Sequence, residues 1–394
     1  MNSIRRLQII SRHLCNSTRS QLFNLSRRRT GFTSFPILRQ MSSNSDDEVI
    51  FERFGTKGVI TLNRPKSLNA LNLSMVNKIY PKLKEWEENP ETTMIIMKAS
   101  GEKAFCAGGD ILSATGAGTA GSEFFNKEYV LNHAIGTCLV PYIAFIDGIT
   151  MGGGVGLSVH GQFRIATERT LFAMPETAIG LFPDVGGSYV LPRLGHSLGL
   201  YLALTGFRLK GRDVYKSGIA THMVDSENLP KVEMDLLALE NPSTQDIMDL
   251  LRRYHLECKT GRERDFILAD KLDDINRLFA GDTMEEIFQN LENEGTQWAK
   301  QQLETLRKMS PTSMKVTLRQ LTAGADLDLP ECLIMESRIA RGCLRNHDFY
   351  EGVRAVLVDR DHSPKWQPDT LEGVTDDIVE DHFSLIEGDT DLEL

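Results

Sequence analysis

Cysteine is scarce in this chain, and no two cysteines stand at the C-x-x-C spacing. The six cysteines are at positions 15, 106, 138, 258, 332 and 343. Disulfide-stapled domains and structural zinc sites both need several ligand residues at short, regular spacings. The sequence therefore predicts neither a disulfide framework nor a metal site, and we expect free, mostly buried thiols.

A long apolar run is also missing. A helix that crosses a bilayer takes about 20 apolar residues. The best apolar stretch, residues 148–159, has 12 residues, of which five are glycine. The sequence therefore predicts no membrane partner. With 41% hydrophobic and 25% charged residues over 394 positions, the composition is typical of a folded chain with one large domain or two smaller ones.

Acidic residues are absent from positions 1–45, which contain eight arginines, nine serines and no lysine. This composition is typical of an organelle transit peptide, and a disordered basic tail is the alternative. We expect this segment to be removed, with the mature chain beginning near residues 40–48. The remaining 349 residues carry 36 basic and 54 acidic side chains, a formal net charge of −18. Because such a surface repels phosphate backbones, we expect no nucleic-acid partner.

Residues 46–225 alternate short β-rich runs with helical patterns, which predicts an α/β core. The expected strands are Val59–Leu62, Met94–Met97 and Tyr142–Ile146. The expected helices run from Ser74, as the N-cap, to Trp86, and over about residues 124–138.

The polar segment 225–244 contains two prolines, and we interpret it as a linker. Residues 226–394 are then expected to form this linker and a C-terminal α-helical region. The expected helices there are Leu268–Leu278, Glu285–Leu291, Trp298–Leu306 and, after a Ser310–Pro311 start signal, Met314–Leu321.

Several familiar motifs fail. The run Gly154-Val155-Gly156 lacks the closing glycine of G-x-G-x-x-G, and the chain has no Walker A lysine. The run from Gly156 to His160 resembles a nucleophile elbow, but His160 replaces its closing glycine. We therefore interpret Ser158 and His160 as structural residues.

Glycines gather after two of the predicted strands, in Phe105–Asp110 and in Asp147–Gly156. Loops at strand ends are favoured ligand positions in α/β folds, and glycine lets backbone amides approach a ligand. Tight turns are the alternative explanation for either cluster alone. Two such clusters together favour a ligand site.

Two carboxylates, Glu176 and Asp184, stand eight residues apart in the apolar segment Phe172–Gly187. Burying an unpaired carboxylate is costly, so each side chain either reaches water or has a function. The alternative role for Asp184 is a helix N-cap, and for Glu176 a first-turn helix acid.

The motif Asn63-Arg64-Pro65-Lys66-Ser67-Leu68-Asn69-Ala70-Leu71, the two glycine loops and Pro175–Glu176 occur in this order. From about residue 49 to 366 the chain thereby resembles the crotonase, or enoyl-CoA hydratase/isomerase, superfamily. The resemblance implies a crotonase-like core of repeated ββα units that binds an acyl-CoA. It also implies that the backbone amides of Gly109 and Gly153 hold the thioester oxygen. Preorganised donors of this kind each contribute about 3 to 4 kcal/mol to a transition state.

Hydratases of the superfamily use two glutamates, whereas this chain has Gly156 at the first of those positions and Glu176 at the second. Losing one carboxylate undermines the paired acid and base work of hydration. The segments similar to the branch that hydrolyses 3-hydroxyisobutyryl-CoA are 151–160, 174–187, 348–355 and 364–366. The resemblance therefore implies hydrolysis of that thioester in valine degradation in the mitochondrial matrix, with 3-hydroxypropanoyl-CoA as a further substrate.

The resemblance also implies a role for each acidic residue. Glu176 would attack the thioester carbon or activate a water as general base, and Asp184 would orient the substrate 3-hydroxyl or handle protons. Glu128 would line the acyl pocket, which gives Glu128, Gly153, Glu176 and Asp184 as the substrate contacts. No metal or cofactor is implied beyond the CoA of the substrate, and a homo-oligomer is left open. An enoyl-CoA hydratase or isomerase, and a non-catalytic organellar binding subunit, are the alternatives.

Overall fold

The computed structural model describes residues 39–41, 47–112, 120–385 and 388–394. Of the expected transit peptide only Arg39–Met41 lies in these ranges, where it forms strand β1 and pairs antiparallel with β2, Val49–Phe54. These three residues, which the sequence placed in the removable segment, belong to the sheet. The remainder of that prediction lies outside the described residues. Ile37–Leu394 form one structural unit.

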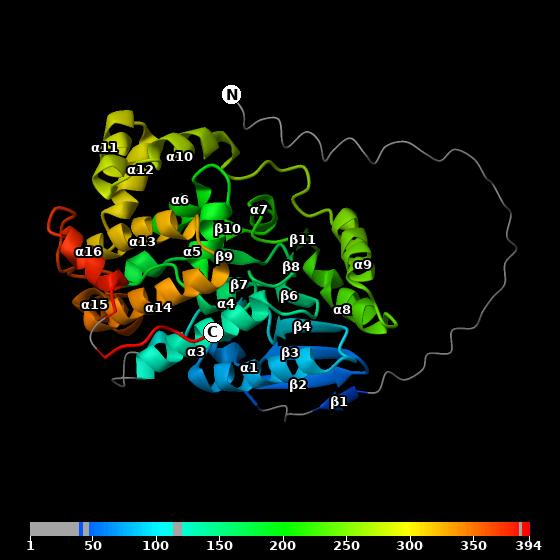
Figure 1. Cartoon of the computed structure of the whole chain (residues 1–394). Helices are drawn as coiled ribbons and strands as arrows, with labels where there is room; N and C mark the ends of the chain where they lie inside the picture. The colour runs from blue at the N-terminus through cyan, green and yellow to red at the C-terminus, as the bar shows by residue number, and fades with distance from the viewer. Residues whose placement is uncertain (1–38, 42–46, 113–119, 386–387) are drawn as a thin grey trace, which may run out of the picture. The chain divides into compact units, whose positions relative to one another are not determined.

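The larger sheet has seven strands in the order β1-β2-β3-β4-β6-β8-β11 (Figure 1). Beyond β1 and β2 its strands are β3 (Lys57–Leu62), β4 (Met94–Ala99), β6 (Tyr142–Ile146), β8 (Phe163–Ala166) and β11 (His222–Met223). β1, β2 and β3 are antiparallel neighbours, whereas every pair from β3 to β11 is parallel. All residues of β3 and β6 are buried, as in a sheet covered on both faces. The three strands predicted from apolar runs are confirmed as β3, β4 and β6.

A second sheet has four strands in the order β10-β9-β7-β5. Its strands are β5 (Ala104–Cys106), β7 (Ile149–Met151), β9 (Leu171–Ala173) and β10 (Leu209–Lys210). β5, β7 and β9 are parallel, and each comes directly after one strand of the larger sheet, namely β4, β6 and β8. A helix follows each pair: α3 (Ala120–Gly136), α4 (Gly153–Gly156) and the 3-10 helix η2 (Glu176–Ile179). The repeated strand–strand–helix unit is the predicted fold class.

Helix α1, Leu73–Glu88, packs against α3 and buries an apolar face that includes Ile79 and Leu83. The predicted N-cap at Ser74 is wrong. Asn72 caps the helix instead, because its side chain accepts a hydrogen bond from the Met75 amide at 2.9 Å. Asn and Ser are both good caps, so residue type alone does not distinguish Asn72 from Ser74.

The segment 225–244, interpreted as a linker, contains a turn of 3-10 helix, η4 (Ser226–Asn228), and helix α8 (Leu229–Ala238). Pro230 stands in the first turn of α8, where its missing amide proton costs nothing. Leu229, Val232 and Leu236 join Val59, Ile96 and Phe145 of the larger sheet in one buried cluster. The linker interpretation is therefore wrong. α8 and α9 (Thr244–Glu257) lie beside that sheet in Figure 1.

Beyond α9, the described residues form helices joined by loops. Its helices are α10 (Leu272–Leu278), α11 (Met284–Glu294), α12 (Gln297–Leu306), α13 (Pro311–Gly324), α14 (Leu329–Arg345), α15 (His347–Val353) and α16 (Asp376–Phe383). The short elements of the chain are η1 (Pro65–Ser67), α5 (Gly187–Val190), η3 (Leu191–Arg193), α6 (Leu198–Thr205), α7 (Arg212–Lys216), η5 (Ala269–Lys271) and η6 (Arg354–Val358).

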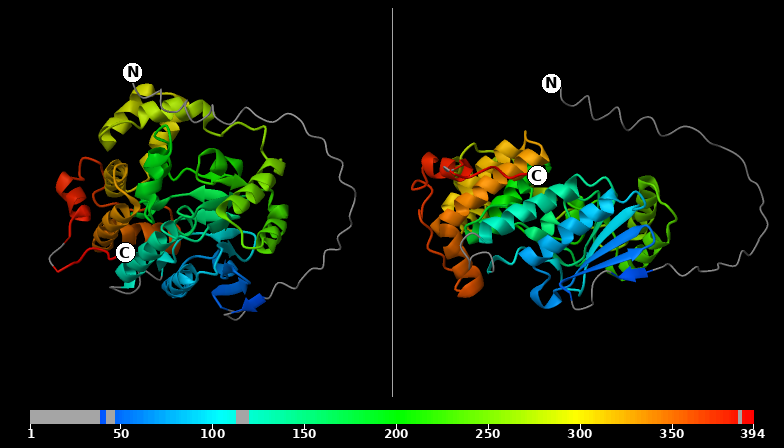
Figure 2. Two further views of the ribbon diagram at one scale, coloured as in Figure 1. Left: turned by 45° about the vertical axis from the view of Figure 1, so that its right-hand side comes forward. Right: turned by 60° about the horizontal axis from the view of Figure 1, so that its bottom comes forward.

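The predicted C-terminal helices are confirmed as α10 to α13, and Ser310 caps α13 as expected. α14 packs against both α3 and α5, and both views of Figure 2 show the orange helices beside the cyan α3. These contacts bring the C-terminal helices onto the core. Within the described ranges, no helix has the length and apolar character needed to cross a membrane.

Candidate active site

Three parallel strands of the smaller sheet deliver the predicted site segments. β5 leads into the loop with Gly109, β7 into Gly152 and Gly153, and β9 into Glu176. Because the strands are parallel, their carboxyl ends meet at one edge. A Cβ atom built on Gly153 would lie 3.4 Å from the Gly109 nitrogen, and one built on Gly152 would lie 3.2 Å from Glu176 Oε1. The fold therefore brings the two glycine loops and Glu176 together.

The family-like motif at residues 63–71 positions the first glycine loop. Leu71 donates its amide to the Gly108 carbonyl at 2.8 Å and accepts the Asp110 amide at 2.7 Å. The side chain of Asn69 donates to the Ala104 carbonyl at 2.9 Å. Gly108 has φ +112°, a backbone conformation that favours glycine. These contacts fix the orientation of the Gly109 amide that follows.

Two backbone donors at this edge are unused. Among the described residues, neither the Gly109 amide nor the Gly153 amide donates a hydrogen bond to a protein acceptor. Gly153 is the first residue of α4, where a helix leaves its amides without intrahelical partners. Two fixed, free N–H groups beside each other suit an oxygen that gains negative charge during a reaction.

Two buried carboxylates, Glu128 of α3 and Glu176 of η2, lie at the second glycine loop, and a third, Asp184, lies close enough to both to repel them; we call these three the carboxylate cluster. Their exposed fractions are 2%, 6% and 4%. The hydroxyl of Tyr129 donates to Asp184 at 2.9 Å. Glu128 Oε1 and Glu176 Oε2 have no hydrogen-bond partner within the described part of the chain. The fold therefore brings Glu128 and Glu176, two acids that the family resemblance selected, to the second glycine loop. It brings the third, Asp184, close to both of them.

The structure also tests the alternative roles of Asp184 and Glu176. α5 begins at Gly187 with Gly186 as its N-cap, so the helix-cap role of Asp184 is excluded. Glu176 does begin a short 3-10 helix, but its side chain is buried. Ser158 donates to the Gly154 carbonyl at 2.8 Å and His160 bonds the Val185 carbonyl at 2.7 Å, so each side chain has a structural partner in the backbone, as the structural interpretation expects.

Burial raises the pKa of every acid in the carboxylate cluster, and repulsion from neighbouring charges raises it further for Glu128 and Glu176. Burial is the largest cause for Glu128, followed by the charges of Asp184 and Glu176. Burial and then the Asp184 charge raise the pKa of Glu176. Burial raises the pKa of Asp184 to about 7, against the hydrogen bond from Tyr129. Three acids so arranged do not all ionise at neutral pH, so the cluster offers both a proton donor and a proton acceptor.

A fourth buried acid, Glu336 of α14, holds the segment that follows Asp184. It is 0% exposed and accepts hydrogen bonds from the Gly186 amide at 2.7 Å, from the Ser188 amide at 2.9 Å and from the Ser188 hydroxyl. Burial raises its pKa to about 8. Glu336 is absent from the site predicted from the sequence, although an acid in the largely apolar buried face of α14 is a usable signal.

Two further features fix the backbone on either side of Asp184. Gln320 of α13 donates to the Pro183 carbonyl at 2.7 Å. Val185 has φ +53°, a strained conformation for a β-branched residue, which its surroundings must enforce. The C-terminal helices therefore position Asp184, and the predicted helical region is part of the site's construction.

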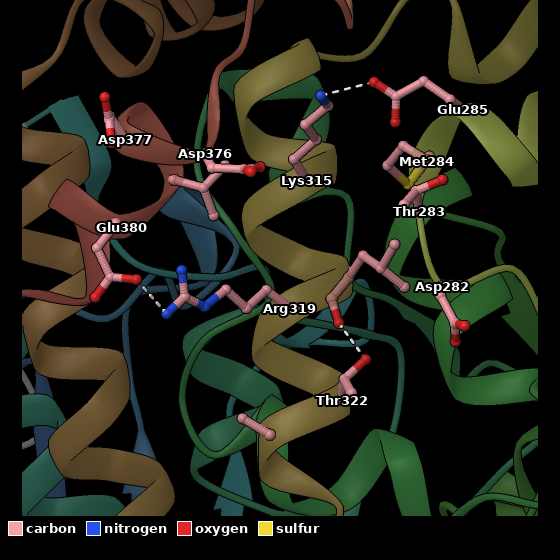
Figure 3. A pocket seen from close by; sticks show the side chains of 13 residues that line it. Asp282, Thr283, Met284, Glu285, Lys315, Arg319, Thr322, Asp376, Asp377 and Glu380 are labelled. Atoms are coloured by element: carbon pink, nitrogen blue, oxygen red, sulfur yellow. Dashed lines mark hydrogen bonds and ion pairs between the residues drawn. The ribbon is translucent and has the colours of Figure 1, made fainter.

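A large groove lies away from this site. It has a volume of about 870 Å³ and is lined by residues of α11, α13 and α16, with none from the carboxylate cluster. Figure 3 shows Lys315 reaching Glu285, at 2.7 Å, and Arg319 reaching Glu380 across this groove. Its two cations are thus already paired. Among the described residues, no group of three or more His, Cys, Asp or Glu side chains is arranged to hold a metal ion.

Comparison with known proteins agrees with the fold and the motifs. A family model described as enoyl-CoA hydratase/isomerase matches residues 57–383. The chain is 57% identical over 360 residues to the human protein named 3-hydroxyisobutyryl-CoA hydrolase, mitochondrial, covering 90% of this chain and 93% of that protein. It is 56% identical over 372 residues to the Xenopus laevis protein of the same name, covering 92% and 96%.

Similar solved structures also come from proteins that are named for acyl-CoA chemistry. A carnitinyl-CoA dehydratase from Mycobacterium thermoresistibile matches with a TM-score of 0.80 and 34% identity, over 87% of this chain and 98% of that one. An enoyl-CoA hydratase from Rhodobacter sphaeroides matches with a TM-score of 0.77 and 35% identity, over 88% and 100%. The chain belongs to the enoyl-CoA hydratase/isomerase family.

Proposed function

We propose that this protein hydrolyses the thioester of 3-hydroxyisobutyryl-CoA, releasing 3-hydroxyisobutyrate and CoA, and that it also accepts 3-hydroxypropanoyl-CoA. The single observation that carries the proposal is the pair of free amides at Gly109 and Gly153 beside the buried carboxyl of Glu176. The names of relatives more than 50% identical over about 90% of the chain support this choice of substrate. The word mitochondrial in these names supports a mitochondrial location, and we propose that the protein acts there, in the matrix, in valine degradation.

The chemistry follows from the positions of these groups. The thioester oxygen accepts hydrogen bonds from the Gly109 and Gly153 amides, which stabilise the negative charge that develops there. Glu176 either attacks the carbonyl carbon, forming a mixed anhydride that water opens, or removes a proton from an attacking water. In both routes the carbon–sulfur bond breaks, and the CoA thiolate takes a proton from an acid that burial keeps protonated. Asp184, whose pKa lies at about 7, suits this proton transfer.

Hydration is the second candidate, since two similar solved structures are named a dehydratase and a hydratase. It needs a carboxylate at position 156, where this chain has glycine. A Cβ atom built on Gly156 would lie 2.6 Å from Asn132 Nδ2 and 2.8 Å from Val185 Cβ. The space for a side chain at this position is therefore already filled, which favours hydrolysis.

A non-catalytic binding subunit is the third candidate. Three carboxylates with raised pKa values, buried together beside unused amides, are costly to maintain and are typical of active sites. This arrangement favours catalysis.

The experiment is a thiol-release assay of the purified protein with 3-hydroxyisobutyryl-CoA, run beside an absorbance assay for a conjugated double bond. We expect free CoA to appear without any change in double-bond absorbance. Altered absorbance with a constant thiol level would contradict hydrolysis in favour of hydration, and tight binding without either signal would contradict catalysis.

A further inference from the structure

Asn132 stands out among the buried polar side chains. It is 0% exposed, and neither its amide nitrogen nor its amide oxygen has a hydrogen-bond partner among the described residues. A buried carboxamide can donate two hydrogen bonds and accept two, so leaving all of them unmade is costly. Such a group in a native fold calls for a specific explanation.

Helix geometry places Asn132 beside the carboxylate cluster. Glu128 and Asn132 are four residues apart on α3 and share one face of that helix. Glu128 Oε1 lies 2.5 Å from a Cβ built on Gly153, and Asn132 Nδ2 lies 2.6 Å from a Cβ built on Gly156. Gly153 and Gly156 are three residues apart on α4. The two polar side chains of α3 therefore face two successive positions of α4.

The spacing along α4 matches the size of a short acyl group. Three residues of helix advance about 4.5 Å, so the position of Gly156, which Asn132 faces, lies about this far along α4 from Gly153, whose amide is proposed to hold the thioester oxygen. A hydroxyl on the β-carbon of an acyl group is three bonds from the carbonyl carbon. A thioester held by Gly109 and Gly153 can therefore extend its β-hydroxyl to Asn132.

The chemistry of the amide also matches. A hydroxyl both donates and accepts, and a carboxamide offers both an acceptor oxygen and a donor nitrogen. The neighbouring acid Asp184 already accepts a hydrogen bond from Tyr129. Within the described part of the chain, Asn132 is thus a neutral group beside the cluster with its whole hydrogen-bonding capacity unused.

Building on the proposed function, we propose that Asn132 binds the β-hydroxyl of the substrate and selects 3-hydroxyacyl-CoA thioesters over acyl-CoA thioesters without the hydroxyl. Asp184 is then free to handle protons. A site built to pair with a hydroxyl rejects an analogue that lacks it, because its own polar atoms stay unpaired in the complex.

The test compares 3-hydroxyisobutyryl-CoA with isobutyryl-CoA, which differs only in the hydroxyl, in thiol-release assays. The variant is Asn132→Leu, which keeps the side-chain volume and removes both polar atoms. We expect the wild-type protein to favour the hydroxylated substrate in kcat/KM by about 10- to 100-fold. In Asn132→Leu this ratio should fall to within about threefold of unity, through loss of activity on the hydroxylated substrate alone.

The matched control is Asn126→Leu, the same substitution on the same helix. Asn126 already accepts a hydrogen bond from the Ser337 hydroxyl at 2.8 Å, so its replacement should leave the substrate ratio unchanged. If Asn132→Leu does not fold, Asn132→Ala gives the same comparison. Equal losses on both substrates would overturn the proposal, because they indicate a bound water or a purely structural amide, and so would an unchanged ratio. Absence of thiol release by the wild-type protein would instead overturn the proposed function.

Discussion

Replacing Asp184 by asparagine should make the protein more stable and less active. Asn keeps the size of the side chain and an oxygen that can accept the Tyr129 hydroxyl, whose bond to Asp184 is 2.9 Å. It removes a carboxyl whose pKa is raised by burial from 3.8 to about 7. Between these two values the unfolded chain has lost its proton while the folded chain still holds it, so the stability of the wild type falls as the pH rises through this window.

The size of the effect follows from the shift. One pKa unit corresponds to about 1.4 kcal/mol, so the gain in unfolding free energy for Asp184→Asn should grow from about 2 kcal/mol at pH 5 to about 4 kcal/mol at pH 9. The variant also removes a charge that raises the pKa of Glu128 and of Glu176, which acts in the same direction. Loss of proton transfer should lower kcat by about 100-fold.

The assay is chemical denaturation of both proteins across this pH range, with thiol release measured on the same samples. Tyr129→Phe is the matched control, because it removes the hydrogen bond to Asp184 but keeps the carboxyl. It should leave the decline of stability with pH in place. An Asp184→Asn protein whose stability difference from the wild type is the same at pH 5 and pH 9 would refute the electrostatic reasoning.

Three further substitutions test the surroundings of the site. Gly156→Ala should lower the unfolding free energy by about 1 to 3 kcal/mol, because its Cβ would meet Asn132 at 2.6 Å; an unchanged denaturation midpoint would contradict this crowding. Glu336→Gln places an amide donor opposite the Gly186 amide and should cost about 1 to 3 kcal/mol of stability and about 10- to 100-fold in kcat. Wild-type kcat in a folded Glu336→Gln protein would show that α14 does not position Asp184. Ser158→Ala loses only the bonds from the hydroxyl to the Gly154 and Val155 carbonyls and should keep kcat within about twofold; loss of thiol release in folded protein would restore Ser158 as a nucleophile.

Much of the fold could be predicted from local sequence patterns. Short continuous apolar runs predicted the strands β3, β4 and β6, because successive residues of these strands are buried on both faces of the sheet. Ser310 followed by Pro311 marked the start of α13 because both residues satisfy the needs of a helix N-terminus. Pro230 predicts a linker by the same kind of reasoning, but proline is equally suitable for a first helical turn, and the structure places Pro230 in the first turn of α8.

Fewer of the site residues could be predicted from the local sequence. Glu176 and Asp184 stood out because they interrupt an apolar segment, whereas Glu128 was selected only by the family resemblance, since a charge on a helix usually faces water. Glu336 bonds a loop that lies about 150 residues earlier in the chain, and no spacing rule connects positions so far apart. Asn132 becomes informative only when its burial and its missing partners are known.

The most direct measurement is the rate of CoA release from 3-hydroxyisobutyryl-CoA by the wild-type protein and by Glu176→Gln, each verified as folded by thermal denaturation. Glutamine preserves the shape of the side chain but can neither attack the thioester as an anion nor take a proton from water. We predict rapid release by the wild type and a rate lower by at least about 1000-fold in the variant, with an equal or higher melting temperature because a buried acid has been removed. Comparable release by a folded Glu176→Gln protein would contradict the central claim that this carboxyl acts on a thioester held by the Gly109 and Gly153 amides.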